Sequence, residues 1–112
     1  MNTIISDWKG ECIDYLDGID GNYGALIDVK NNNAKLCRDE CLAKSKDYKF
    51  IGLRVETCYC MKESPASDKQ VPNFLCNMYC KGNRNEMCGG VDGDDRRVTV
   101  HQLVSIGRHT QL

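Results

Sequence analysis

Eight cysteines in a chain of 112 residues limit what this protein can fold into more than any other feature. They are spaced as C-x3-C, C-x-C, C-x3-C and a final C-G-G. An even number at this density is typical of disulfide-bonded domains from oxidising compartments. A structural zinc site more often uses C-x2-C pairs with a nearby histidine, and the chain has no C-x2-C and carries His101 and His109 outside the cysteine-rich region. We therefore predict four disulfides, no metal and a secreted or extracellular location. The eight positions are Cys12, Cys37, Cys41, Cys58, Cys60, Cys76, Cys80 and Cys88.

The length suits one domain, but its apolar content is thin. Hydrophobic residues make up 41% of the chain only if the cysteines are counted. Disulfides worth roughly 2–4 kcal/mol each must therefore supply part of the stability. The net charge of -1 and the scattered lysines and arginines argue against a nucleic-acid partner. The sequence contains no run of about 20 apolar residues, so we predict no membrane span in this chain.

Short apolar stretches separated by polar turns predict a small α+β fold. Asn31, Asn32 and Asn33 are candidate caps for a helix over residues 34–46. Cys37 and Cys41 would lie four residues apart on that helix, with Cβ atoms about 6 Å apart. A disulfide requires roughly 3.5–4.5 Å, so each should fasten the helix to another element. The same spacing separates Cys76 and Cys80 on a short helical turn that Asn73 would cap. Strands are expected at 8–13, 50–55, 58–61 and 97–104.

The segment 14–24 is rich in glycine, aspartate and asparagine, which favours turns. Asp14, Asp17 and Asp20 recur at a spacing of three. A calcium loop of the EF-hand type needs alternating oxygen ligands and a closing glutamate, and this stretch lacks that pattern. We therefore interpret these aspartates as turn-forming residues.

Several motifs together resemble the WSC domain, a small extracellular cysteine-rich module of yeast cell-wall stress sensors, fungal glycan-active enzymes, polycystin and Kremen proteins. Gly10-Glu11-Cys12-Ile13-Asp14 resembles its opening motif with one inserted residue. Cys37-Arg38-Asp39-Glu40-Cys41 matches its C-x3-C helix, and Tyr48-Lys49-Phe50-Ile51-Gly52-Leu53 with Cys58-Tyr59-Cys60 matches its central strands. Cys76-Asn77-Met78-Tyr79-Cys80-Lys81-Gly82, Met87-Cys88-Gly89-Gly90 and Arg97-Val98-Thr99-Val100 match its ending. The resemblance places a domain at residues 8–104, with 1–7 and 105–112 as flexible termini.

The resemblance implies a short antiparallel sheet with one main helix stapled across it. The implied pairs are Cys12–Cys76, Cys37–Cys58, Cys41–Cys60 and Cys80–Cys88. We expect a bulge or irregular strand around Cys58 and Cys60, so that both can bond to the same helix. Met61, Tyr79 and His101 depart from the family pattern, where glycine, proline and tyrosine are usual. Because these segments could border a ligand surface, the specificity of relatives should not be assumed.

The residue types in this sequence favour a binding function over a catalytic one. A nucleophile would need a nearby base, and none is evident. A pair of carboxylates for glycoside hydrolysis is left open by the sequence, although solvated surface acids are the simpler interpretation. We predict a non-enzyme without a cofactor that binds a glycan or polysaccharide. The candidate contact residues are Tyr59, Tyr79, Tyr15, Tyr23 and Trp8, with Asn77, Asn83, Arg84 and Asn85 as polar partners.

The expected exposure of the aromatic residues ranks these candidates. Tyr79 should face solvent, since it replaces the family proline in a loop-like segment. Tyr59 should point away from both neighbouring cysteines, either outward or into the core, whereas Trp8 has the features of a core residue. Phe50 and Phe74 are expected to be buried. The alternative function is an extracellular protein-interaction or structural module of a larger receptor or secreted protein, which would present an apolar patch with a polar rim.

Overall fold

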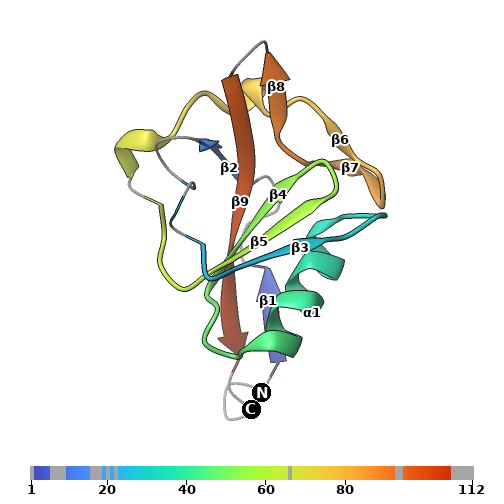
Figure 1. Cartoon of the computed structure of the whole chain (residues 1–112), viewed down its shortest axis with the longest axis vertical. Coiled ribbons are helices and arrows are strands. Elements are labelled where there is room, and N and C mark those ends of the chain that lie inside the picture. The colour runs from blue at the N-terminus through green and yellow to red at the C-terminus, as the bar shows by residue number, and fades with distance from the viewer. Residues whose placement is uncertain are drawn as a thin grey trace.

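One long strand, β9 (Asp95–Ile106), organises the sheet in the computed structural model (Figure 1). The structure describes residues 2–5, 10–15, 19, 21, 23–65, 67–92 and 95–106. β9 pairs antiparallel with four other strands, and the sheet contains seven strands in total. Its main path runs β1–β9–β4–β5–β3, with β2 and β8 also paired to β9. The members besides β9 are β1 (Asn2–Ile5), β2 (Glu11–Asp14), β3 (Ala25–Asp28), β4 (Phe50–Arg54), β5 (Thr57–Met61) and β8 (Gly90–Asp92).

A second sheet has two strands, β6 (Tyr79–Cys80) and β7 (Asn83–Met87). Two short 3₁₀ helices, η2 (Ser67–Lys69) and η3 (Asn73–Leu75), lie in the long connection before it. The small disulfide-rich α+β fold expected from sequence is therefore confirmed, with an antiparallel sheet more extensive than expected. β1 and the C-terminal end of β9 pair with each other, so the segments expected to be flexible termini include paired strand. Residues 107–112 lie outside the described residues.

The helix α1 (Ala34–Lys44) begins where the asparagine run predicts. The Asn33 side chain is the N-cap, and its Oδ1 accepts a hydrogen bond from the backbone N–H of Leu36 at 2.8 Å. The helix ends two residues earlier than expected because Ser45 adopts extended backbone angles. Within the described residues, no helix combines the length and hydrophobicity that crossing a membrane requires.

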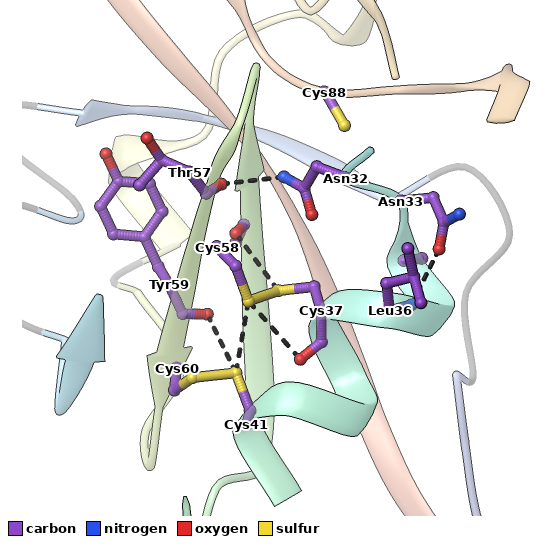
Figure 2. The surroundings of a disulfide bond; sticks show 12 residues. Asn32, Asn33, Leu36, Cys37, Cys41, Thr57, Cys58, Tyr59, Cys60 and Cys88 are labelled. Carbon is purple, nitrogen blue, oxygen red and sulfur yellow. Dashed lines mark hydrogen bonds between the residues drawn. A yellow bond between two sulfur atoms is a disulfide. The ribbon is translucent and has the colours of Figure 1, made fainter. Parts of the chain in front are cut away.

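Two adjacent disulfides fasten α1 to β5, as Figure 2 shows. Cys37 bonds to Cys58 and Cys41 to Cys60, and the Sγ atoms of Cys41 and Cys58 lie 3.5 Å apart. The expected bulge is wrong, because β5 pairs in regular register with both β3 and β4. Residues two positions apart on a strand already share one face. The remaining bonds join Cys12 to Cys76 and Cys80 to Cys88, which gives the four pairs that the family resemblance implies.

The sheet separates two packed clusters. On the helix side, buried residues include Ile51 and Leu53 of β4 together with the four cysteines of the α1–β5 disulfides. On the other side, Tyr59 and Met61 pack with Val98 and Val100. Gly52 allows this second packing, since a Cβ there would lie 2.8 Å from Val98 Cγ1 and 3.2 Å from Tyr59 Cβ. Alternation along β5 thus sends cysteines to one side and large apolar residues to the other.

Asn32, a fully buried residue, joins three loops. Its side-chain Nδ2 donates to the carbonyls of Val55 and Thr57 at 3.1 and 3.0 Å, which closes the turn between β4 and β5. Its backbone carbonyl accepts from the N–H of Gly82 at 2.9 Å in the turn between β6 and β7. A side chain at Gly82 would meet the Asn31 carbonyl oxygen at 2.0 Å, so the two turns approach closely. The start of α1 is therefore tied to both hairpins.

Replacement of Asn32 tests this connection. Asn32→Leu has a similar volume but leaves the partly buried Val55 and Thr57 carbonyls without their donor, and we expect the unfolding free energy to fall by about 1–3 kcal/mol. Asn31→Ala, at the exposed neighbouring position, should change it by less than about 0.5 kcal/mol. Equilibrium urea unfolding measures both. Equal effects of the two substitutions would contradict a specific role for Asn32.

Loop length predicts an order among the disulfides. Cys12–Cys76 spans 64 residues and Cys80–Cys88 spans 8. In the chain-entropy account, the longer loop restricts the unfolded chain more, by about 2 kcal/mol for these lengths. The double variant Cys12→Ala/Cys76→Ala should therefore lose about 2 kcal/mol more unfolding free energy than Cys80→Ala/Cys88→Ala. Denaturant titration of both variants under non-reducing conditions checks this order, and the reverse order would show that native packing outweighs loop entropy here.

Candidate functional site

The structure divides the residues predicted to contact a ligand into two groups. Tyr15, Tyr23 and Tyr59 come together on the face of the sheet opposite α1. Tyr79 lies in the β6–β7 hairpin region together with the predicted polar partners. Trp8 lies outside the described residues. The predicted polar partners of Tyr79 are Asn77, Asn83, Arg84 and Asn85.

Tyr59 is at the centre of the first group and is only 1% exposed. The ring centroids of Tyr15 and Tyr23 lie 5.8 and 5.4 Å from that of Tyr59, in tilted and edge-on arrangements. The Arg54 guanidinium carbon lies 5.6 Å from the centre of the Tyr15 ring, a cation–π distance. Figure 2 shows the Tyr59 ring on the side of β5 away from the cysteines and α1. Tyr59 does point away from both cysteines, but Tyr15 and Tyr23 pack against its ring and it is not exposed to solvent.

Burial also changes the acidity of Tyr59. Loss of solvent disfavours the phenolate and raises the pKa of Tyr59 above its usual value, while Arg54 acts in the opposite direction. Tyr59 is therefore a structural residue that supports its two half-buried neighbours. A direct ligand contact from this group can come from Tyr15 or Tyr23.

Three exposed side chains, Phe74, Met78 and Tyr79, lie within six residues of chain that end at Tyr79 of the second group, and we call them the aromatic edge. The exposed fractions of these side chains are 76%, 38% and 60%. The expected exposure of Tyr79 therefore agrees with the structure, whereas the expected burial of Phe74 is wrong. η3 is a single turn of three residues, and its sheet contact is made by Asn73, whose Oδ1 accepts from the Cys12 N–H at 3.2 Å. Phe50, the other phenylalanine expected to be buried, is only partly buried.

The backbone of the aromatic edge is firmly held. Cys76 and Cys80, which flank Met78 and Tyr79, are tied by disulfides to Cys12 and Cys88. The Met78 N–H donates to Gly89 O at 3.0 Å, and Met78 O accepts from the Cys88 N–H at 2.7 Å. Aromatic side chains on a fixed backbone lose little conformational freedom when they bind a partner.

Polar side chains accompany the aromatic edge. Asn77, Arg84 and Asn85 are exposed, and Asn83 is partly buried. The Oδ1 of Asn83 accepts from the Asn85 N–H at 2.9 Å, so this oxygen already has a role within the hairpin. Phe74 and Met78 are the members that sequence reasoning missed. The available signal was the shortness of the element, which is too short to show an apolar period.

The β6–β7 turn also carries an ion pair with the main sheet. Lys81 Nζ bonds to Glu56 Oε2 in the β4–β5 turn. This contact with Lys81 lowers the pKa of Glu56 below its ordinary value. The pair brings the β6–β7 turn to the β4–β5 turn, while the Gly82 N–H bond to Asn32 O connects the same turn to the start of α1.

A hollow lies beside Tyr23 and has a volume of about 540 Å³. We call it the Tyr23 groove. A smaller hollow of about 220 Å³ shares Ser64 with it and is also bordered by Glu11, Phe50, Val100 and Gln102. The residues that line the Tyr23 groove are Gly21, Tyr23, Gly24, Lys62, Glu63, Ser64 and Pro65.

The cysteine sulfur atoms in this chain have a structural role. The Sγ atoms of Cys37, Cys41 and Cys58 lie within 4.8 Å of one another, a spacing that could suggest a metal site. All eight cysteines form disulfides, however, and none is free. Metal coordination and nucleophilic attack both require the thiolate. The gathered sulfurs are therefore explained by two neighbouring disulfides.

Comparison with known proteins identifies the family. The family model described as WSC domain matches residues 12–90, which is more than half of the chain, and the chain belongs to this family. It is 38% identical over 69 residues to Protein SLG1 of Saccharomyces cerevisiae, covering 62% of this chain and 17% of that protein. It is 33% identical over 69 residues to Xylosyltransferase oxt of Drosophila pseudoobscura pseudoobscura, covering 60% of this chain and 8% of that protein. The chain thus spans less than a fifth of the length of either relative.

The raised pKa of Tyr59 predicts a loss of stability at alkaline pH. The folded state keeps its proton at pH values where the unfolded chain has released it, so this contribution is complete below pH ~10 and is lost as pH rises through the folded pKa. Wild-type protein should therefore lose more unfolding free energy between pH 8 and pH 11 than Tyr59→Phe. Tyr79→Phe, at an exposed position, is the matched control and should behave as wild type. Urea unfolding at both pH values gives the comparison, and identical losses in wild type and Tyr59→Phe would disprove it.

Proposed function

Taking membership of the WSC family as the premise, we propose that this domain is an extracellular, non-catalytic module that binds glycans. We further propose that the aromatic edge is its principal contact surface. The observation that carries the proposal is the exposure of Phe74 and Tyr79, at 76% and 60%, on a backbone fixed by two disulfides. Burying large aromatic side chains is favourable, so their exposure on a rigid segment needs a reason.

Glycan chemistry matches this surface. One face of a sugar ring presents C–H groups that can lie against an aromatic ring, and its hydroxyls exchange hydrogen bonds with polar side chains. Phe74 and Tyr79 offer rings, while Asn77 and Arg84 offer donors at exposed positions. Both parts of a sugar thus have complementary groups within a short stretch of chain.

The disulfide framework supports the proposed location. Four disulfides persist in oxidising compartments and are rare in the cytosol. Six of the eleven buried residues in the helix-side cluster are cysteines, so the core itself depends on that oxidation. This dependence on oxidation supports a secreted or extracellular location.

A binding role also suits the side chains that remain. His101, the histidine that the structure describes, is 2% exposed, and a Cβ on Gly10 would lie 3.0 Å from its ring. The cysteine sulfurs are all bonded. Neither group is available as an accessible base or nucleophile.

The second candidate function is a protein-interaction module of a larger protein. The aromatic edge also favours this alternative, because an exposed apolar patch with polar neighbours is typical of protein interfaces. The two functions differ in their ligand, and the same variants address both.

A glycan array with the oxidised protein tests the proposal. Wild-type protein should bind one class of glycan, and Tyr79→Ala and Phe74→Ala should each weaken binding about tenfold or more, since stacking on one aromatic ring contributes on the order of 1–2 kcal/mol. Both positions are exposed, so near- and far-ultraviolet circular dichroism should be unchanged.

Leu26→Ala provides the matched control, since Leu26 is 49% exposed on β3, which belongs to a different sheet from β6 and β7. Its glycan binding should equal that of wild type. Absence of array binding by correctly folded protein, together with Tyr79-dependent binding to a protein partner, would replace the glycan proposal with the alternative.

A further inference from the structure

We infer that the Tyr23 groove is a second sugar-binding site, so that one domain holds two glycan segments at once. The inference rests on the proposed function for its ligand class, but on different residues for its site. The groove and the aromatic edge share no residue. The functional consequence is that a single domain would cross-link polysaccharide chains.

The size of the Tyr23 groove fits a small ligand. Its volume of about 540 Å³ falls within the range of ~300–1,000 Å³ that is usual for small-molecule sites. One wall is formed by Tyr23 and Gly24, and the other by residues 62–65 after β5. The second hollow also borders Ser64, so the two hollows adjoin at this residue and offer more room than one compact sugar needs.

Tyr23 is held in place before any ligand arrives. Its ring meets that of Tyr59 edge-on, with centroids 5.4 Å apart and planes at 72°. Tyr59 is in turn buried beneath Tyr15 and Tyr23. A ring fixed in this way offers a flat apolar surface at little entropic cost. The buried tyrosine therefore has an indirect role, because it positions the one that lines the groove.

The polar lining favours a neutral, hydroxyl-rich ligand. Lys62 and Glu63 are adjacent and opposite in charge, so the groove has no net preference for an anion or a cation. Together they offer both donors and acceptors. The Ser64 hydroxyl donates to Pro65 O at 3.0 Å and keeps its oxygen lone pairs for an incoming donor. Sugar hydroxyls both donate and accept, and they match such a mixed set.

The Tyr23 groove and the β6–β7 turn, which follows the aromatic edge in the chain, adjoin opposite ends of β5. The groove wall follows Met61, the last residue of β5, whereas the turn before β5 contacts the β6–β7 hairpin through Glu56 and Lys81 (Figure 1). At about 3.4 Å per residue, β5 alone separates these ends by roughly 14 Å. Two sugar segments can therefore be bound without competing for the same space.

Stoichiometry and cross-linking together test the inference. Isothermal titration would use neutral hexasaccharides of β-glucan, chitin and α-mannan as probes. For the probe that binds, wild-type protein should take up two hexasaccharides per chain. Ser64→Trp, which fills the groove from an exposed position, and Tyr79→Ala should each reduce this to one. The double variant should bind none, and Leu26→Ala should retain two.

Avidity gives a second readout. On the immobilised polysaccharide of the same class, each single variant should bind about 10²-fold more weakly than wild type, because two linked sites reinforce each other. Glu63→Ala, a milder change at an exposed groove residue, should weaken only the groove site and keep the stoichiometry at two.

The outcomes separate this inference from the proposed function. One hexasaccharide per wild-type chain, with Ser64→Trp unchanged, would overturn the second site and leave the aromatic edge as the glycan site. A second outcome is one bound hexasaccharide per wild-type chain, with binding lost in Ser64→Trp and kept in Tyr79→Ala. That result would place the glycan site in the groove and overturn the inference of two sites. Binding of none of the three probes by folded wild-type protein would overturn both.

Discussion

The pair of disulfides between α1 and β5 is the constraint on which the rest of this structure depends. Cys37 and Cys41 occupy one face of the helix, and Cys58 and Cys60 occupy one face of the strand. Their sulfurs fill space that a larger domain would fill with leucine or phenylalanine. A chain of this size buries too little apolar surface to hold a helix on a sheet by packing alone. The disulfide sulfurs therefore serve both as covalent links and as part of the packed core.

This arrangement leaves the other face of the sheet to be covered by large side chains. Because side chains alternate along β5, the strand that contributes two cysteines to one face contributes Tyr59 and Met61 to the opposite one. Tyr59 then supports Tyr15 and Tyr23 nearer the surface. The same alternation thus generates the core on one side and the support for the Tyr23 groove on the other.

The remaining two disulfides serve the aromatic edge. Cys12–Cys76 and Cys80–Cys88 bracket the short segment that carries Met78 and Tyr79. The Gly82 N–H bond to Asn32 O then joins the hairpin to the start of α1, and the Glu56–Lys81 pair joins it to the β4–β5 turn. A segment with little regular structure of its own is held in one conformation by contacts at both of its ends. That rigidity is what makes its exposed rings suitable for recognition.

The sequence by itself determined the disulfide-rich α+β class, the helix start and the central strands. These follow from short-range rules: the capping preference of Asn33, the i, i+4 geometry that prevents Cys37 from bonding Cys41, and the period of residues 50–55. The exposure of Tyr79 was also predictable, since it replaces the family proline in a loop-like segment. Only the tertiary structure decided that Tyr59 is buried and Phe74 exposed. Burial depends on which side chains from other segments pack against a residue. Tyr15, Ile19 and Tyr23 pack in one cluster with Tyr59, whereas Phe74 is 76% exposed, and no local pattern encodes that difference.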